Sequence, residues 1–222
     1  MNKGKLIVVE GACDGIGKTT QYNMLKDRLE KEGYNVVSHH FPSYGTKQAE
    51  DVEKYLRGEF GKPSELSPYF INELYANDRK VTWFDSLKKS FDEGSIILLD
   101  RYTTSSLIYQ SALIDDLDEK KKFINYVVNY EYHEIGIKEP DQVIFLTAPF
   151  DTVTSLRTKR KDNDGVINDI HEQDLNFMKK VYENAQFIAN YLKWDIIECS
   201  KDNEMLPINE IHEKIYARIN KK

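Results

Sequence analysis

Short runs of apolar, mostly β-branched residues alternate along the chain with longer stretches whose apolar positions recur every three to four residues. The short runs, which predict strands, cover 6–9, 35–38, 96–99, 142–146 and 195–199. Runs of this kind are typical of strands buried on both faces of a sheet. The longer stretches, which predict helices, cover 19–32, 68–92, 118–133, 152–160, 172–192 and 208–219.

The alternation of strands and helices predicts an α/β fold with a parallel sheet and right-handed crossovers. In the stretch 172–192, Phe177, Val181, Ala185 and Ile188 fall on one face, as expected for an amphipathic helix. Open sheets of this type bind ligands at the carboxyl ends of their strands, so we expect the functional residues to gather there. No internal repeat or linker-like tract interrupts the pattern, and we expect one domain over 1–222.

Composition and charge narrow the possible partners. The net charge of −6 argues against a nucleic-acid partner, because sequence-independent binding to phosphate backbones depends on an excess of Lys and Arg. No apolar stretch reaches membrane-spanning length, and the start 1–5 leads directly into a strand pattern, so we expect neither a membrane partner nor export. Cys13 and Cys199 give no disulfide framework, which favours the reducing cytoplasm.

The segment 11–20, Gly-Ala-Cys-Asp-Gly-Ile-Gly-Lys-Thr-Thr, lies between the first predicted strand and the first predicted helix. Glycines let backbone N–H groups turn toward phosphate oxygens, a lysine reaches the terminal phosphates, and a hydroxyl holds Mg²⁺. Lys18 and Thr19 fill the last two roles. Five residues separate the first glycine from the Gly-Lys pair, one more than the usual spacing. Either Ala12 takes the place of the first glycine, or the loop carries one extra residue.

A second cluster, Asp100-Arg101-Tyr102, directly follows the third predicted strand. A carboxylate at the end of a buried strand can bind Mg²⁺ beside phosphates. Arg101 offers a planar fork for a further phosphate. The alternative interpretation is that Asp100 and Arg101 simply pair with each other at the edge of the sheet.

Two further segments each have a functional and a structural interpretation. Tyr75 and Arg79 lie four residues apart and so share a helix face, where a ring can stack on a nucleobase and a guanidinium can donate to a base carbonyl. Otherwise the ring belongs to the core and the arginine to the surface. The basic segment 157–168 has a turn at Asp164-Gly165 and is either a solvated loop or a lid over phosphates.

Taken together and in this order, these motifs resemble the bacterial thymidylate kinases. The resemblance runs from Lys5 to about Ala185 and rests on the Asp-Gly-x-Gly-Lys-Thr loop, a Phe-Pro-x-Tyr segment, the Asp-Arg pair on the following helix, Asp-Arg-Tyr with a nearby Tyr, and the basic segment. Members of this family transfer a phosphoryl group from ATP to dTMP. The resemblance therefore implies a three-layer kinase fold with a five-stranded parallel sheet, ATP and dTMP as substrates, Mg²⁺ as cofactor and a homodimer.

The resemblance also implies roles for individual residues. For ATP it implies Gly11, Ala12, Cys13, Asp14, Gly15, Ile16, Gly17, Lys18, Thr19, Thr20 and Arg157. For dTMP it implies Asp14, Phe41, Pro42, Tyr44, Tyr75, Arg79, Arg101, Ser105, Ser106 and Tyr109. The implied catalytic residues are Lys18, Asp14, Arg101 and Arg160, and the implied Mg²⁺ ligands are Thr19 and Asp100.

In the acceptor set, Tyr75 would stack on thymine, Arg79 would meet its carbonyl and Arg101 would hold the dTMP phosphate. Tyr109 would lie against the deoxyribose, unless its ring serves ordinary packing. Ser106 stands where many relatives have an asparagine that contacts the base edge, so Ser105 or a water is a possible substitute.

In the donor set, the glycine at position 15 places the chain with those relatives whose catalytic arginine comes from the lid. The lid is expected at about 157–171. Arg160 is the first candidate for the catalytic cation, with Lys159 and Arg157 as alternatives.

Other functions remain open from the sequence. A kinase for another nucleoside monophosphate would use the same parts. A deoxynucleoside kinase would need a carboxylate base near the 5′ position of the sugar, for which Asp14 or Glu10 is available. A nucleotide-dependent switch is a third possibility, since 162–165 matches the Asp-x-x-Gly pattern of GTPases. However, this pattern lies late in the chain, and no Asn-Lys-x-Asp guanine reader occurs.

Overall fold

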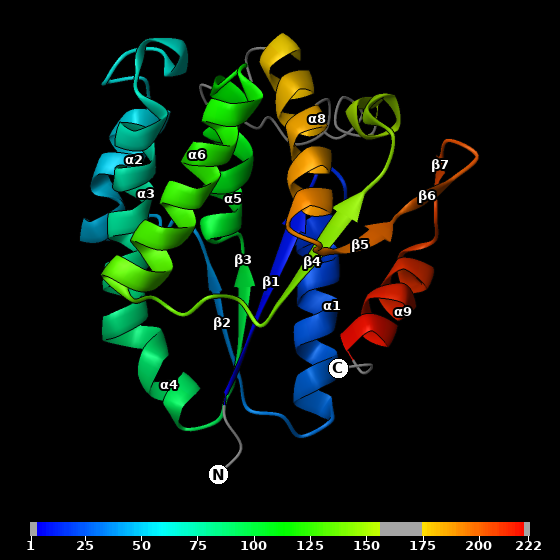
Figure 1. Ribbon diagram of the computed structural model, residues 1–222. Coiled ribbons are helices and arrows are strands. Elements are labelled where there is room, and N and C mark those ends of the chain that lie inside the picture. Colours follow the sequence, from blue (N-terminus) through cyan, green and yellow to red (C-terminus); the bar gives the residue numbers. More distant parts are fainter. Residues whose placement is uncertain (1–3, 156–174, 220–222) are drawn as a thin grey trace.

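A parallel sheet of five strands in the order β2-β3-β1-β4-β5 forms the centre of the computed structural model, which describes residues 4–155 and 175–219 (Figure 1). The strands are β1 (Lys5–Gly11), β2 (Val36–His40), β3 (Ile96–Asp100), β4 (Gln142–Thr147) and β5 (Asp195–Glu198). Each coincides with one of the five predicted runs, so the predicted α/β fold is confirmed.

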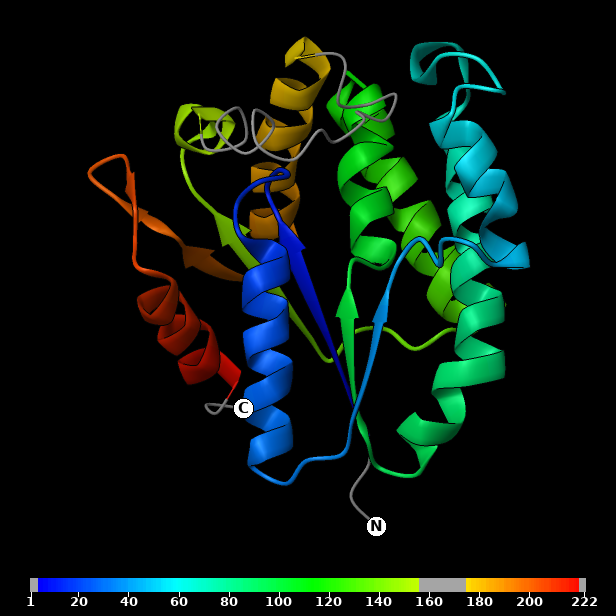
Figure 2. The same ribbon diagram turned by 180° about the vertical axis from the view of Figure 1, so that it is seen from behind.

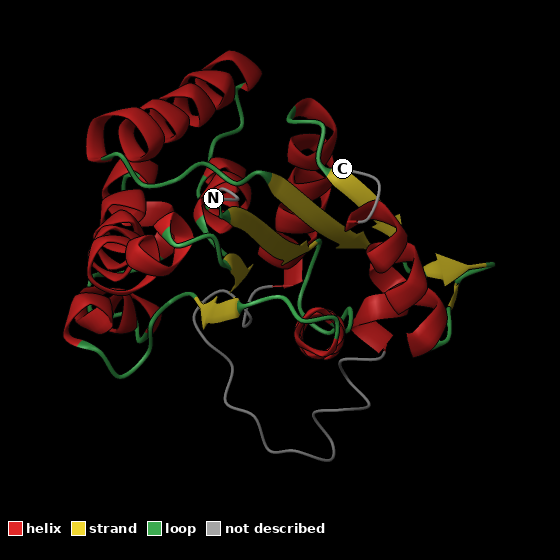
Figure 3. Cartoon of the chain, turned by 90° about the horizontal axis from the view of Figure 1, so that it is seen from below, coloured by secondary structure: helices red, strands yellow, loops and turns green. Residues whose placement is uncertain are grey.

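Helices cover both faces of this sheet, as the views from behind and from below show (Figures 2 and 3). The helices with defined bounds that are longer than one turn are α1 (Lys18–Lys31), α2 (Glu50–Leu56), α3 (Pro68–Thr82), α4 (Lys88–Asp92), α5 (Thr103–Tyr109), α6 (Leu117–Val128), α8 (Leu175–Tyr191) and α9 (Ile208–Ile219). Residues 150–155 are also helical. α1 and α9 pack on one face, and α3 to α6 and α8 cover the other. Among the described residues, no helix has the length and apolar composition that crossing a bilayer requires.

The central strand β1 shows why its sequence is continuously apolar. Ile7 and Val9 are buried against the side of α1 and α9, whereas Leu6 and Val8 are buried on the opposite side. Successive side chains of a strand point to opposite faces, so a strand covered on both sides needs apolar residues at every position. Each such burial contributes about 1.5–3 kcal/mol.

Two predicted helices contain a π-helical turn. The stretch 68–92 is regular in α3, widens at Trp83–Leu87 and continues as α4, and α6 continues into a π-helical turn at Asn129–Ile135. Apolar spacings of three and four residues do not reveal such a turn, because one extra residue changes the helix phase without changing its composition. The second of these turns carries a residue of the candidate site.

The sequence patterns predicted neither α5 nor a small hairpin. α5 begins Thr-Thr-Ser-Ser, residues of modest helix propensity, and forms because its Leu107 and Ile108 are buried against α6 and α8. The hairpin joins β6 (Ser200–Lys201) to β7 (Glu204–Met205). Asp202 and Asn203 at its tip have φ of 51° and 64°, and this dipeptide is the signal that could have found the turn. The predicted lid, about 157–171, lies outside the described residues.

Candidate active site

The phosphate loop connects the carboxyl end of β1 to α1. Gly15 and Gly17 have φ of 95° and 90°, conformations that other residues rarely adopt. Gly17 is the N-cap of α1, and within the described chain no side chain caps that end. The first N–H groups of α1 therefore face the loop, where they can bind an anion together with the positive end of the helix dipole.

The structure favours one of the two interpretations of the loop spacing. A Cβ on Gly11 would lie 2.9 Å from Cγ2 of Ile16, so the loop closes tightly over this glycine. Ala12 still continues the sheet, because its N–H donates to the carbonyl of Leu146 at 2.9 Å. Gly11 thus serves as the close-approach glycine, and the loop carries one extra residue. Cys13 and Ile16 point into the core on the α1 side, which leaves their backbone for the loop.

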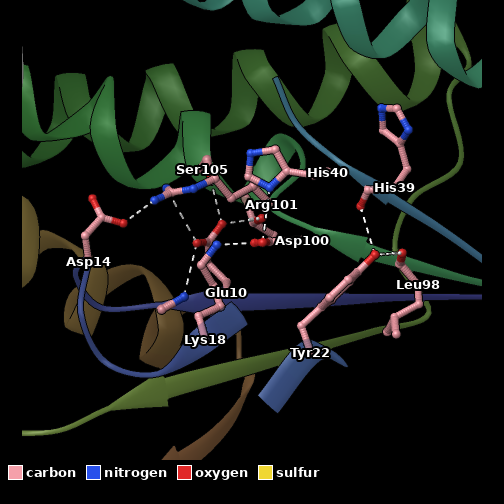
Figure 4. A network of polar contacts seen from close by, with 12 residues as sticks. Glu10, Asp14, Lys18, Tyr22, His39, His40, Leu98, Asp100, Arg101 and Ser105 are labelled. Carbon is pink, nitrogen blue, oxygen red and sulfur yellow. Dashed lines mark hydrogen bonds and ion pairs between the residues drawn. The ribbon is translucent and has the colours of Figure 1, made fainter. Parts of the chain in front are cut away.

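Lys18 and Asp100 meet because β1 and β3 are neighbours, with Val9 opposite Asp100. Lys18 Nζ donates to Asp100 Oδ1, and His40 Nδ1 lies 3.1 Å from Asp100 Oδ2 (Figure 4). Burial alone would raise the pKa of Asp100, but the hydrogen bond from His40 and the charge of Lys18 hold it well below its usual value. Asp100 is therefore a carboxylate.

Burial is the main reason that the pKa of Lys18 is lowered, and the nearby charge of Arg101 lowers it further. The carboxylates Glu10 and Asp100 oppose this shift. The carboxylate that Lys18 contacts thus offsets part of the effect of burial.

Arg101 faces the phosphate loop in a strained conformation. Its φ is 66°, and such a conformation in a non-glycine residue costs about 1–3 kcal/mol and concentrates at functional sites. Its Nη2 lies 2.5 Å from Oδ1 of Asp14, and its guanidinium carbon lies 5.5 Å from the centre of the Tyr109 ring. Burial alone would lower the pKa of Arg101, but Tyr109, Asp14 and Glu10 raise it well above its usual value. The interpretation that Asp100 and Arg101 pair with each other is wrong, since each has other partners.

Glu10 joins the end of β1 to the start of α5. It is fully buried and accepts hydrogen bonds from Thr104 Oγ1 at 3.0 Å, Ser105 Oγ at 2.7 Å and the N–H of Gly11 at 3.1 Å. Its Oε1 also lies 4.0 Å from Nη1 of Arg101. Glu10 therefore holds the helix that carries much of the cavity wall against the phosphate loop.

A cavity that is partly open to solvent, with about 620 Å³ of empty space, lies beside Arg101. The structure brings all the predicted dTMP residues to its wall, namely Asp14, Phe41, Pro42, Tyr44, Tyr75, Arg79, Arg101, Ser105, Ser106 and Tyr109. Tyr44 is 56% exposed and so lies at the rim. The peptide bond before Pro42 is cis.

The same wall includes residues that the sequence analysis did not assign, namely His40, Leu56, Tyr102 and Gln110. His40 could have been found from its place at the end of β2, since β2 pairs with β3 and His40 lies opposite Asp100. Gln110 follows Tyr109 at the end of α5, and its amide carries both a hydrogen-bond donor and an acceptor.

Arg79 reaches the cavity from α3 although it is only 1% exposed. Glu131 accepts from its Nε and its Nη2, both at 2.7 Å, and Ser106 Oγ accepts from Nη2 at 2.9 Å. The interpretation that places Arg79 on the surface is therefore wrong. Glu131 was not predicted as a site residue, because it lies 52 residues further along the chain and belongs to no motif.

The remaining predicted site residues have fewer contacts that define their position in the site. Thr19 and Thr20 begin α1 and are exposed. Tyr75 is half-buried, and its ring centre lies 6.1 Å from that of Tyr55. Arg157 and Arg160 lie outside the described residues.

A glycine-rich loop between a strand and a helix, a carboxylate on the adjacent strand and a deep cavity across from the loop define a P-loop α/β protein that can hold a phosphate chain beside a second ligand. The family model for thymidylate kinase matches residues 9–215. The chain therefore belongs to the thymidylate kinase family.

Curated relatives and a solved structure agree with this assignment. The chain is 34% identical over 181 residues to the thymidylate kinase of Thermoanaerobacter sp. strain X514, covering 82% of this chain and 81% of the relative. It is 33% identical to the probable thymidylate kinase 1 of Saccharolobus solfataricus, with coverage of 91% and 93%. The structure of thymidylate kinase from Candida albicans matches with a TM-score of 0.72 at 22% identity, covering 99% of this chain and 92% of that chain. This last likeness shows a shared fold.

Proposed function

We propose that this protein transfers the γ-phosphoryl group of ATP to the phosphate of dTMP, giving dTDP and ADP. The observation that carries the proposal is the position of the Arg101–Asp14 pair between the phosphate loop and the cavity wall. A cation at this point can hold an acceptor phosphate facing the donor. We also propose that residues 1–222 form a single domain that carries this activity.

On the donor side, the N–H groups of the loop and Lys18 bind the β- and γ-phosphates of ATP. The Thr19 hydroxyl and the Asp100 carboxylate are hard oxygen ligands of the type that Mg²⁺ prefers when it also binds phosphates. The low pKa of Asp100 supports this role, since a metal ligand must be deprotonated. When bound there, Mg²⁺ would neutralise charge on the phosphates.

On the acceptor side, the cavity offers a ring and a set of polar groups for a pyrimidine. Tyr75 supplies the stacking surface, and Arg79 supplies N–H donors for a base carbonyl. The Gln110 amide adds a donor and an acceptor at the same wall. Arg101 holds the phosphate, and Tyr109 packs beside the sugar.

Catalysis in this arrangement consists of positioning and charge neutralisation. The acceptor phosphate is already an anion, so no general base is required. Asp14 holds the Arg101 fork until the acceptor phosphate binds. The lid, with Arg160 as the cation on the transferred group and Lys159 or Arg157 as alternatives, completes the proposal. Single alanine substitutions at these three positions, compared by kcat, decide among them.

The structure weighs against the use of Glu10 as the base of a nucleoside kinase. Glu10 is fully buried, and two hydroxyls and a backbone N–H already donate to it. A hydroxyl acceptor would also leave Arg101 facing no phosphate. Asp14 alone remains for that rival, and a nucleoside in the assay tests it.

The testing experiment measures ADP release from ATP by the purified protein with dTMP, dUMP, dGMP and thymidine in turn. We expect dTMP to give the highest kcat/KM. A higher kcat/KM with thymidine would establish a nucleoside kinase. Nucleotide hydrolysis that needs no acceptor, with GTP preferred over ATP, would establish a switch protein.

The quaternary and cellular parts of the proposal are a homodimer in the cytoplasm, without a nucleic-acid or membrane partner. The exposed Tyr69 and Phe70 of α3, with Tyr69 in edge contact at 4.8 Å with the half-buried Tyr126 of α6, offer an apolar surface for a second copy. Sedimentation velocity tests the dimer, and a mass near the 25.9 kDa of one chain would contradict it.

A further inference from the structure

The buried ion pair between Arg79 and Glu131 lies behind the wall of the cavity. Arg79 is 1% exposed and Glu131 is fully buried. The two carboxylate oxygens of Glu131 accept hydrogen bonds from Nε and Nη2 of Arg79, at 2.7 Å each. This bidentate contact fixes the plane of the guanidinium as well as its position. Glu131 itself does not belong to the cavity wall, whereas Arg79 does.

Other elements hold the carboxylate in place. Thr103 Oγ1, at the start of α5, donates to Glu131 Oε2 at 2.8 Å. The backbone carbonyl of Glu131 accepts from the N–H groups of Gly136 and Ile137, both at 3.1 Å, which closes the π-helical turn around it. Arg79 therefore has its orientation set by α5 and the π-helical turn, not by α3 alone.

This arrangement leaves the guanidinium nitrogens with unequal contacts. Nε and Nη2 each have a charged partner at 2.7 Å, and Nη2 also donates to Ser106. Nη1 has only a long contact of 3.5 Å to the carbonyl of Tyr102 among the described residues. Nη1 is thus the nitrogen best able to donate to a ligand in the cavity. A guanidinium carries N–H donors and no acceptor, so this position, fixed by Glu131, can donate but never accept.

We infer that Glu131 is a positioning residue for recognition of the acceptor base, acting through Arg79. By fixing the fork, Glu131 makes the cavity select a base with a carbonyl oxygen at this point and reject one that carries an amino group there, because two donors would then face each other. In chemical terms, the fixed fork favours a thymine or uracil monophosphate over a cytosine monophosphate. The inference rests on the proposed function.

The test compares Glu131→Gln, which removes the charge but keeps the shape, with the wild-type protein. We expect KM for dTMP to rise about tenfold or more, equivalent to the loss of one well-placed hydrogen bond. KM for ATP stays unchanged. The ratio of kcat/KM for dTMP to that for dCMP falls by a similar factor, because a fork that is free to turn no longer rejects the amino group.

The matched control is Glu134→Gln in the same π-helical turn, where Glu134 is exposed and accepts from Asn129. It should leave both KM values and the dTMP to dCMP ratio unchanged. A merely structural role for Glu131 predicts a lower kcat from a smaller folded fraction, with KM and the base ratio as in wild type. That result would overturn the inference.

A second variant keeps the test decisive if Glu131→Gln does not fold. Thr103→Val removes only the hydroxyl that donates to Glu131, and it should raise KM for dTMP by a few fold while lowering the dTMP to dCMP ratio. If Thr103→Val leaves both unchanged, the inference fails. A wild-type protein that does not phosphorylate dTMP would instead refute the proposed function, and this is measured first.

Discussion

Two arginines in the wall of the same cavity each pair with a carboxylate, but the two pairs differ in how permanent they are. In the Arg101–Asp14 pair the side chains are 19% and 32% exposed, whereas in the Arg79–Glu131 pair they are 2% and 0% exposed. A partly exposed pair contributes little and exchanges partners easily, while a buried pair cannot lose one partner without leaving an uncompensated charge. The phosphate end of the cavity, at Arg101 and Asp14, can therefore exchange its ion pair for a ligand. The base end, at Arg79 and Glu131, keeps its ion pair when a ligand binds.

The same contrast extends to Lys18 and Asp100. Lys18 contacts Asp100, yet both are expected to bind ligand groups, so this pair must rearrange when the phosphates of ATP arrive. Arg79 and Glu131 need no such rearrangement. Selectivity for the base then depends on a fixed wall, and catalysis depends on charges that change partners.

The largest expected difference is in stability. Glu131→Ala should lower the free energy of unfolding by about 3–5 kcal/mol, because it leaves the buried charge of Arg79 unpaired. Asp14→Ala should change it by less than about 1 kcal/mol. Urea unfolding of both variants measures this. Equal losses would show that the two pairs do not differ in the way described.

At the phosphate end, Lys18→Ala should lower kcat with dTMP about 10²–10³-fold, since a charged donor aimed at the transferred group is lost. Lys26→Ala is the matched control, because Lys26 lies on the same helix and forms a partly exposed ion pair with Glu30 at 4.0 Å. Steady-state ADP release gives both values. Near-normal turnover of Lys18→Ala would count strongly against phosphoryl transfer at the loop.

Arg101→Ala should lower kcat/KM for dTMP about 10²-fold, and Arg101→Lys should restore only part of it, because an ammonium does not replace a planar fork. KM for ATP should change much less. Arg57→Ala, at an exposed arginine paired with Glu59, serves as the control. If KM for ATP were affected more than kcat/KM for dTMP, Arg101 would belong to the donor site.

The smallest effect concerns the packing of α9 against α1. His212 on α9 is 6% exposed, and burial together with the charge of Arg28 lowers its pKa. The unfolded chain, with a histidine pKa of about 6.5, then binds more protons, so stability is complete above that pH and is lost as pH falls below it.

His212→Gln should reduce the change in unfolding free energy between pH 7.5 and 5.5 by no more than about 1.4 kcal/mol, the equivalent of one pKa unit. The exposed His133→Gln is its control. A pH dependence that is unchanged in His212→Gln would mean that this helix contact does not respond to acid.

Much of the fold and of the phosphate end could be predicted from the sequence, because both follow local rules. Continuous apolar runs gave the strands, and the loop motif needs a fixed order of residues at 11–20. The lining residues that a family resemblance could name, such as Tyr75 and Arg101, lie together at one cavity.

What could not be predicted depends on contacts between distant segments. Glu131 continues the buried face of Ile124 and Val127, where helix periodicity predicts an apolar residue, and no local pattern shows that its partner is Arg79. The burial of Arg79 likewise contradicts the usual exposure of arginine, since it depends on a partner 52 residues away. The fixed end of the site was thus the harder one to predict.

The central claim is that the phosphoryl group of ATP passes to the phosphate of dTMP. ³¹P nuclear magnetic resonance of the purified protein with ATP, Mg²⁺ and dTMP tests it most directly, because each product has its own phosphorus signals. We predict that the single dTMP signal is replaced by the two coupled signals of dTDP as ADP forms. Accumulation of inorganic phosphate while the dTMP signal stays unchanged would contradict the account.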